Sequence, residues 1–258
     1  MITILTYHDV FSVAPAREAR HYDITAELLR QHLEVLATAA MVSLAPEKLQ
    51  VPARLGSSSY FLSFDDGAAQ HAGVTAPLLE AAGVRGIFFV PTQRLNRAGY
   101  LTTEDVKRMH DAGHVFGLHG HQHRRLDHLS ESALEEEFSS SRKILREITG
   151  QNPWIFAPVG GYHSPRLTEV AKRHGVLAIR TMRWGLNRRP DPYDLETVPL
   201  SRDFDGITLL KILKSGHFGS GYGTKEFFKN LLPETLYQRI RQTVPRIERT
   251  LSLPSRDG

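Results

Sequence analysis

The sequence predicts an α/β protein, because short apolar runs alternate with helix-like segments along most of its 258 residues. A strand followed by a helix and then by another strand favours parallel pairing, with the helices packed outside the sheet. Both a closed barrel and an open sheet satisfy this order. No linker rich in proline, glycine or serine divides the chain and no internal repeat is visible. We therefore expect a single domain over residues 1–258.

The expected strands are apolar runs of four or five residues that are bounded by polar or turn-forming residues. Pro91 directly follows one of them, and proline ends a central strand because it has no N–H to donate to the ladder. In order along the chain, the expected strands cover residues 2–6, 60–64, 86–90, 114–118, 154–157 and 176–180.

The expected helices show apolar residues at helical spacing, or residues that begin and end helices. In the first of them, Leu29, Leu33 and Leu36 recur at intervals of four and three. Ser130 suits an N-cap and Gly150 suits the residue after a helix C-terminus. The expected helices cover residues 25–39, 74–82, 102–113, 130–148, 165–174 and, as a basic amphipathic helix, about 233–251.

Composition excludes several kinds of site and partner. The chain has no cysteine, which rules out structural disulfides and thiolate metal ligands. Its formal charge of +4 is scattered, without a basic run or a recognition motif, so we expect no nucleic-acid partner. No apolar stretch approaches the roughly 20 residues of a membrane span. The sequence does not indicate an oligomeric state.

The N-terminus begins directly with an apolar run and shows no signal-peptide pattern. We therefore expect a cytoplasmic location for the chain as written. A periplasmic or cell-envelope location is the alternative if the chain is a mature or trimmed form.

The strand expected at 60–64 ends in two adjacent carboxylates, Asp65 and Asp66, followed by Gly67. Neighbouring side chains on an extended backbone diverge, so the two carboxylates have different surroundings. One of them can ligate a metal while the other acts on what the metal holds. The alternative interpretation is a strand followed by an ordinary Asp-Asp-Gly turn.

Three histidines, His119, His121 and His123, lie within five positions directly after another expected strand. On a helical turn the spacing of four brings the imidazoles of His119 and His123 to one side. A carboxylate and two histidines leave coordination positions open for water and a substrate oxygen. Nitrogen and oxygen ligands without thiolate favour Zn²⁺, and Co²⁺, Ni²⁺ and Fe²⁺ also suit them.

Residues 63–67 and 119–123 together resemble the TFDDG and H-[ST]-x-x-H motifs of the NodB-homology polysaccharide deacetylases. The resemblance implies a distorted (β/α)₇ barrel and a divalent-metal deacetylase that acts on acetylated carbohydrate. It further implies that Asp65 is the general base and that Asp66, His119 and His123 are the metal ligands. Gly120 stands where the family prefers serine or threonine, which removes a contact that supports the second histidine.

The family's general acid is the histidine of a late L-x-x-H-D motif, and residues 5–9 of this chain match that motif at the opposite end. This order resembles the circularly permuted branch that deacetylates the biofilm polymer poly-N-acetylglucosamine. In a closed barrel the first and last strands are neighbours, so a strand moved from end to start keeps its position. The resemblance implies that His8 is the general acid. A buried histidine at a strand end is the alternative interpretation of His8, and His217 is the rival acid.

Two further motifs depart from the family pattern. Residues 154–162 lack the arginine that orients the base, although Val159 can still donate its backbone N–H to an oxyanion. Residues 180–187 lack the acidic residues that the family has before a tryptophan. Arg180 and Arg183 are candidates to replace the missing arginine, and an arginine of the barrel wall or the surface is the alternative interpretation of each. The residues expected to contact substrate are Val159, Tyr162, Trp184 and Arg183, with Phe218 a further aromatic residue suited to a sugar ring.

The motifs together predict metal-assisted hydrolysis of an acetyl group, most simply an N-acetyl group on a sugar. Hydrolysis of a sugar O-acetyl ester or of a non-carbohydrate amide would use the same residues. The missing arginine and acidic residues also allow a carbohydrate-binding protein that has lost catalysis.

Overall fold

A computed structural model describes residues 1–13, 20–50 and 59–216. Residues Met1–Gly216 form one compact unit. The helix expected at 233–251, the rival acid His217 and the aromatic Phe218 lie outside the described residues. The predicted single domain covers residues 1–258 and so includes residues that the structure does not describe. It therefore stays a prediction.

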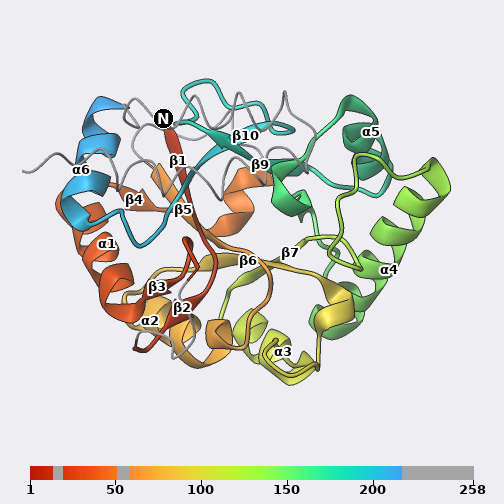
Figure 1. The fold of residues 1–258 in the computed structure, drawn as a ribbon, viewed down its shortest axis with the longest axis horizontal. Helices are drawn as coiled ribbons and strands as arrows, with labels where there is room; N and C mark the ends of the chain where they lie inside the picture. Colours follow the sequence, from red (N-terminus) through yellow and green to blue (C-terminus); the bar gives the residue numbers. More distant parts are fainter. Residues whose placement is uncertain (14–19, 51–58, 217–258) are drawn as a thin grey trace, which may run out of the picture. The chain divides into compact units, whose positions relative to one another are not determined.

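Seven parallel strands close into a barrel, which decides between the two predicted arrangements (Figure 1). The first strand, β1, pairs with β5 over its full length and with β10 on its other side. The ring therefore runs β1-β10-β9-β8-β7-β6-β5 and returns to β1. The strands are β1 (Ile2–Tyr7), β5 (Ser59–Phe64), β6 (Gly86–Val90), β7 (Val115–Leu118), β8 (Ile155–Phe156), β9 (Ala178–Trp184) and β10 (Leu195–Pro199).

Three very short strands lie outside this ring. β4 (Val42–Ser43) pairs with the beginning of β5. β2 (Val10–Phe11) pairs with β3 (Ile24–Thr25), directly after the end of β1. The β2–β3 pair thus holds the segment that contains His8 against the start of the first helix.

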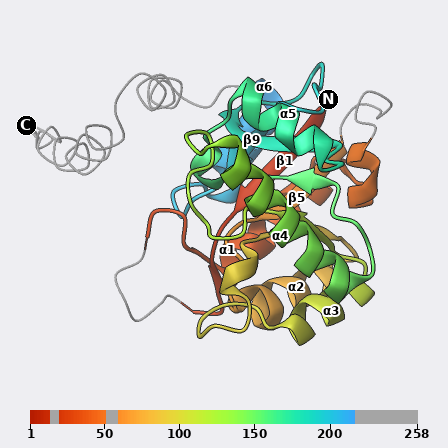
Figure 2. The ribbon, with the colours of Figure 1, turned by 90° about the vertical axis from the view of Figure 1, so that its right-hand side faces the viewer.

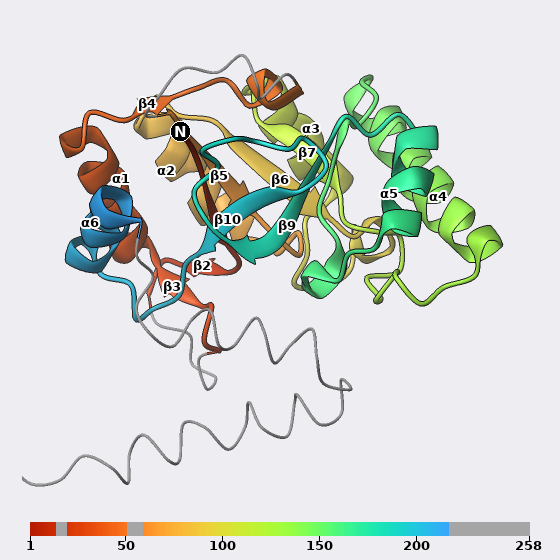
Figure 3. The same cartoon turned by 90° about the horizontal axis from the view of Figure 1, so that it is seen from above.

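Helices lie outside the barrel, as the alternation of strands and helices predicts. α4 and α5 lie side by side in Figure 2, and α1 and α6 lie side by side in Figure 3 although they come from opposite ends of the described chain. The helices are α1 (Ala26–Thr38), α2 (Ala76–Ala81), α3 (Thr103–Asp111), α4 (Glu131–Thr149), α5 (Pro165–Arg173) and α6 (Gly206–Ser215).

Several helix ends match the sequence signals. The Ser130 side chain accepts a hydrogen bond from the N–H of Ala133, and Gly150 follows α4 in the left-handed conformation that glycine favours. Short helical turns complete the connections: η1 (Pro46–Gln50), η3 (His71–Thr75), η4 (Thr92–Arg94) and η5 (Val159–Gly161). Of these, η3 is a π-helical turn that leads into α2. In the described part of the chain, no helix combines the length and apolarity that a bilayer crossing needs.

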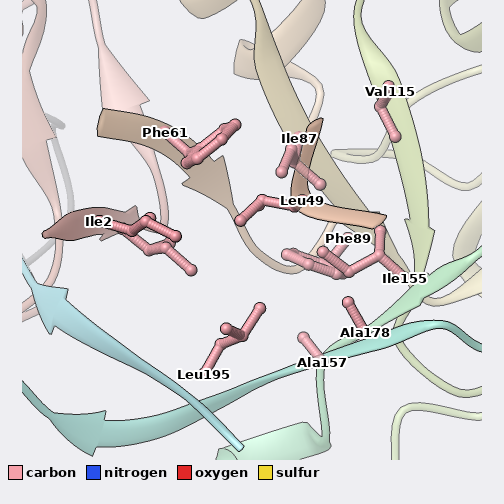
Figure 4. Packing of buried hydrophobic residues seen from close by; sticks show 11 residues of the cluster. Ile2, Leu49, Phe61, Ile87, Phe89, Val115, Ile155, Ala157, Ala178 and Leu195 are labelled. Atoms are coloured by element: carbon pink, nitrogen blue, oxygen red, sulfur yellow. The ribbon is translucent and has the colours of Figure 1, made fainter. Parts of the chain in front are cut away.

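The barrel interior is apolar at one end and becomes polar toward the carboxyl ends of the strands. Figure 4 shows the apolar cluster, which consists of Ile2, Ile4, Leu49, Phe61, Ile87, Phe89, Val115, Ile155, Ala157, Ala178 and Leu195. Two residues further along their strands, Thr6, Ser63 and Thr197 form a layer of buried hydroxyl groups. The Thr6 hydroxyl lies 2.8 Å from that of Ser63 and 2.6 Å from that of Thr197. This layer separates the apolar core from the end of the barrel where the strands finish.

Candidate active site and metal centre

Strand periodicity directs four chemically important side chains toward the barrel mouth. Alternate residues of a strand face the same side. Every second residue after the inward-facing Ile4, Phe61, Val115 and Ala178 therefore also faces the barrel interior, toward the carboxyl ends of the strands. This series of residues reaches His8 after β1, Asp65 after β5, His119 after β7 and Arg180 within β9. Because all these strands are parallel, their carboxyl ends meet at one end of the barrel.

The structure brings Asp66, His119 and His123 together at this end. One potential ligand atom from each residue lies within 4.8 Å of the other two. The Oδ1 atom of Asp66 is 2.8 Å from Nε2 of His123 and 3.3 Å from Nε2 of His119. Asp66 has φ 74° and His123 has φ 56°, so both adopt the left-handed conformation that is unfavourable for residues with a side chain. Asp66 and His123 follow the ends of strands and are not part of the alternating inward-facing residues. Their left-handed backbone conformations direct both side chains to the cluster.

The donor atoms suit a divalent metal ion. The Nδ1–H of His119 donates to the carbonyl oxygen of Ala157 over 2.7 Å, which leaves the lone pair of Nε2 directed at the cluster. Burial raises the pKa of Asp66, but the neighbouring side chains of His119, His123 and His8 lower it by more. The pKa of Asp66 is therefore held well below its usual range, and its carboxylate is ready to ligate a cation. Three ligands of this kind leave positions open, as in catalytic zinc sites.

Asp65 forms a buried ion pair with Arg180. Nη2 of Arg180 donates to Oδ1 of Asp65, and both side chains are almost completely buried. The guanidinium carbon of Arg180 lies 4.9 Å from the ring centroid of Phe89, and Nη1 donates to the sulfur of Met182 over 2.9 Å. The Phe89 ring packs directly against Gly117. A Cβ atom on residue 117 would lie only 2.6 Å from this ring, so the ring position requires glycine there. Arg180 thus contacts Asp65, the residue that the missing arginine of the motif would orient.

Arg183, the other candidate for this replacement, does not contact Asp65 in the structure. Three residues beyond Arg180, it lies on the opposite face of β9, with about half of its side chain exposed. It forms ion pairs with Asp194 over 3.2 Å and with Glu196 over 3.1 Å. Of the two candidates, Arg180 is therefore the one that contacts Asp65, because side chains alternate between the two faces of the strand. Contact of Arg183 with a substrate stays a prediction.

His8 lies directly after β1 and is one of the groups that lower the pKa of Asp66. Its ring stacks on that of Tyr22, with centroids 5.0 Å apart and planes inclined by 20°. The carbonyl oxygen of His8 accepts a hydrogen bond from Nε2 of His71 over 3.0 Å. His8 therefore lies at the same end of the barrel as Asp66, and its role as the general acid stays a prediction.

The three remaining residues expected to contact substrate lie in or beside the same end of the barrel. Val159 begins η5 shortly after β8, and Tyr162 follows that turn. The guanidinium carbon of Arg125 lies 3.6 Å above the ring centroid of Tyr162. Trp184 ends β9, with its ring centroid 6.0 Å from that of Phe204. Their contact with a substrate stays a prediction.

Glu137 is a supporting residue that the sequence motifs did not identify. It lies on α4 with a relative exposure of 1 %, and its Oε2 accepts from the backbone N–H groups of His121 and Gln122 over 2.5 and 3.1 Å. Its Oε1 accepts from Nε of Arg124 over 2.8 Å. Glu137 shares the apolar stripe of α4 with Leu134 and Phe138, and a carboxylate on that stripe was the available signal.

Gly120 belongs to the same arrangement. Its φ is 71°, and a Cβ at this position would lie 3.2 Å from Oε2 of Glu137. The carbonyl oxygen of Gly120 accepts from the N–H of Thr92, and that of His121 accepts from the N–H of Gln93 over 2.9 Å. The loop that carries His123 is thus held from two sides, by α4 and by η4. His121 itself points away from the cluster, with Nδ1 2.9 Å from the Thr92 hydroxyl.

Comparisons with known proteins agree with this fold. Residues 53–179 match the family model described as polysaccharide deacetylase. The chain is 32% identical over 122 residues to YheN of Bacillus subtilis (strain 168), named as a candidate polysaccharide deacetylase. That match covers 46% of this chain and 41% of YheN, so the chain spans less than half of that relative's length.

Two solved structures share the fold over most of their length. The Streptococcus pyogenes deacetylase PplD in complex with acetate superposes with a TM-score of 0.74 at 22% identity, covering 81% of this chain and 96% of PplD. IcaB from Ammonifex degensii superposes with a TM-score of 0.71 at 21% identity, covering 81% of this chain and 95% of IcaB. The motifs and the barrel agree with the family match: residues 53–179 carry the polysaccharide deacetylase domain that the family model describes.

Proposed function

We propose that this protein is a metal-dependent deacetylase that removes N-acetyl groups from a sugar or polysaccharide. The observation that supports this most directly is the convergence of Asp66, His119 and His123 within 4.8 Å, beside the buried Asp65–Arg180 pair. Three neutral or anionic ligands with an adjacent carboxylate match what a hydrolytic metal site requires. Zn²⁺ is the ion that the ligands suit best, and Co²⁺, Ni²⁺ and Fe²⁺ share the same donor preferences.

In this mechanism each protein group has a separate task. A divalent ion bound by the three ligands would polarise the acetyl carbonyl and lower the pKa of an adjacent water. Asp65 takes the proton from the water that attacks the acetyl carbon. Arg180 holds Oδ1 of Asp65, so the other carboxylate oxygen receives that proton. The products are acetate and the free amine of the sugar.

Two further groups act on the tetrahedral intermediate. The N–H of Val159 donates to the oxygen that becomes negatively charged, a role that needs no side chain. His8 then gives a proton to the leaving nitrogen, because an amide nitrogen leaves poorly as an anion. The Asp65–Arg180 pair removes one of the two grounds for a carbohydrate-binding protein without catalysis, the missing arginine, and leaves the other, the missing acidic residues.

Asp65→Asn tests the proposal. Asparagine keeps the shape of the side chain but cannot take a proton, so we expect kcat to fall by about 10²- to 10⁴-fold while metal binding is retained. Acetate release from N-acetylglucosamine oligomers measures turnover, and elemental analysis of the purified full chain measures bound metal. Full activity in Asp65→Asn would contradict the assignment of the base, and a metal-loaded wild-type protein that releases no acetate from any acetylated sugar would contradict the proposed function.

A further inference from the structure

His71 is a buried histidine that the mechanism above does not use. It opens the π-helical turn η3 and its relative exposure is 0 %. Its ring packs against those of Phe64 and Phe88, with centroid distances of 5.8 and 5.4 Å. Its Nε2 lies 3.0 Å from the carbonyl oxygen of His8. Its Nδ1 is also buried and has no hydrogen-bond partner within the described ranges.

The hydrogen bond fixes which ring nitrogen of His71 carries the proton. A carbonyl oxygen only accepts, so Nε2–H is the donor. Burial, the largest influence, lowers the pKa of His71, and the ring is therefore neutral, with a lone pair on Nδ1. A buried acceptor without a donor costs about 1–3 kcal/mol. An apolar side chain packed against Phe64 and Phe88 would avoid this cost, which indicates that the hydrogen bond to His8 has a function.

The segment of His8 is held by three consecutive carbonyl groups. The carbonyl of Tyr7 accepts from the N–H of Asp65 over 3.0 Å, and that of Asp9 accepts from the N–H of Ile24 over 3.0 Å. Between them, the carbonyl of His8 accepts from the side chain of His71. The hydrogen bonds to the carbonyls of Tyr7 and Asp9 come from backbone N–H groups, which do not depend on a side chain. The hydrogen bond to the carbonyl of His8 depends on the side chain of residue 71.

Few side-chain contacts fix the orientation of the His8 ring. Its Nδ1 is buried and finds no hydrogen-bond partner in the part of the chain that the structure describes. Stacking on Tyr22 restrains the ring plane but does not prevent the ring from sliding along that plane. The position of the His8 backbone therefore largely determines where its second nitrogen points.

We propose that His71 is a positioning residue for the general acid, which holds the backbone of His8 so that its imidazole reaches the leaving group. This inference depends on the proposed function, because it requires His8 to protonate the leaving nitrogen. Displacement of a catalytic group by about 1 Å costs on the order of 10²-fold in rate. Loss of the hydrogen bond should therefore slow only those reactions that need the acid.

The test uses two substitutions of similar shape, His71→Gln and His71→Met. Glutamine has an N–H at a comparable distance from the backbone, whereas methionine has none and packs well against aromatic rings. We expect His71→Met to lower kcat for an N-acetylglucosamine oligomer by about 10- to 100-fold with little change in KM, and His71→Gln to restore most of it. We expect His71→Met to have a higher thermal stability than His71→Gln, because methionine buries no unpaired polar atom in this apolar site.

A second substrate separates positioning from folding. The nitrophenolate of 4-nitrophenyl acetate leaves without a proton, so we expect its hydrolysis to change less than about threefold in His71→Met. His114→Met is the matched control, because His114 is equally buried but binds the N–H of Gly86 at the opposite end of the strands. It should leave the ratio of amide to ester hydrolysis unchanged.

The outcomes are distinguishable. Retention of amide hydrolysis in His71→Met, or equal loss of amide and ester hydrolysis, would overturn the positioning role. His8→Ala tests the underlying mechanism separately: it should lower amide hydrolysis and spare the ester. If His8→Ala shows no such difference, the assignment of the general acid is wrong whatever His71 does.

Discussion

Two of the three residues in the candidate metal centre have backbone conformations that residues with side chains rarely adopt. Asp66 and His123 both have positive φ, and each such conformation costs about 1–3 kcal/mol. Among the described residues, Ala40 and Asn96 are the other non-glycine examples. The strain is supported by neighbours, because Glu137 and η4 hold the loop of His123 from two sides. Strain of this kind at a cluster of ligands is typical of a functional site.

At the same scale, we predict that Arg180 contributes to both stability and turnover. Arg180→Met leaves the buried Asp65 carboxylate without its cation, and removing one partner of a buried ion pair costs about 3–5 kcal/mol. Turnover should fall by about 10- to 100-fold, because the base is no longer held in position. Urea denaturation measures the free energy of unfolding, and acetate release measures turnover.

Arg183→Met is the matched control on the same strand. Its ion pairs with Asp194 and Glu196 are partly exposed to solvent, and such pairs contribute about 0–1 kcal/mol. Equal losses of stability in the two variants would refute the special role of Arg180.

Among the elements, the contact between α4 and the loop that follows β7 has the clearest consequence. The Glu137 carboxylate accepts hydrogen bonds from two backbone N–H groups of this loop and pairs with Arg124. Among the described residues, none of its hydrogen bonds is to the side chain of His119 or His123. The loop in turn determines where His123 lies. Helix α4 therefore influences the metal centre through the backbone of the loop and not through a ligand.

We predict that Glu137→Gln weakens metal binding without removing a ligand. The amide has one acceptor oxygen instead of two, so it cannot satisfy both the loop and Arg124. Loss of a residue that supports metal ligands typically lowers affinity about 10- to 100-fold. Titration of the metal-free protein with Zn²⁺ in competition with a chelator measures the affinity, and thermal unfolding of the metal-free protein measures stability.

Glu136→Gln provides the comparison, because Glu136 is the adjacent residue of α4 and is exposed. It changes the net charge equally but does not contact the loop. If both variants bound Zn²⁺ as tightly as the wild type, the influence of α4 on the metal centre would be disproved.

For the whole molecule, closure of the barrel explains how a motif from the start of the chain reaches the site. β1 lies between β10 and β5, so the first strand of the sequence occupies the position next to the last one. The carboxyl end of β1 then lies beside that of β5, and His8 comes to the same end as Asp65. The sequence predicted this neighbourhood from the permuted order of the motifs alone.

The strands and helices that carry the motifs were predictable because their apolar periodicity and helix caps are strong. β10 and α6 were not predicted. β10 has five residues and ends in proline, and α6 is a short apolar segment whose periodicity does not separate a helix from a strand. Its N-cap Asp205 and its C-cap Gly216 were signals in the sequence.

The ligand cluster could be predicted in part, because Asp66, His119 and His123 belong to short motifs. The choice between Arg180 and Arg183 depends on which face of β9 each residue occupies. A shift of one residue reverses the faces, so the choice requires the register of the strand. Glu137 and His71 act through backbone contacts with distant segments. No local pattern contains that information, and only the folded structure provides it.

The central claim is that Asp66, His119 and His123 bind one divalent ion while Asp65 does chemistry beside it. The most direct measurement is the metal content of the purified wild-type protein, of Asp65→Asn and of His123→Ala. The account predicts about one divalent ion per chain in the wild type and in Asp65→Asn, and a large loss in His123→Ala. Equal metal content in the wild type and in His123→Ala, or none in the wild type after exposure to Zn²⁺, would contradict it.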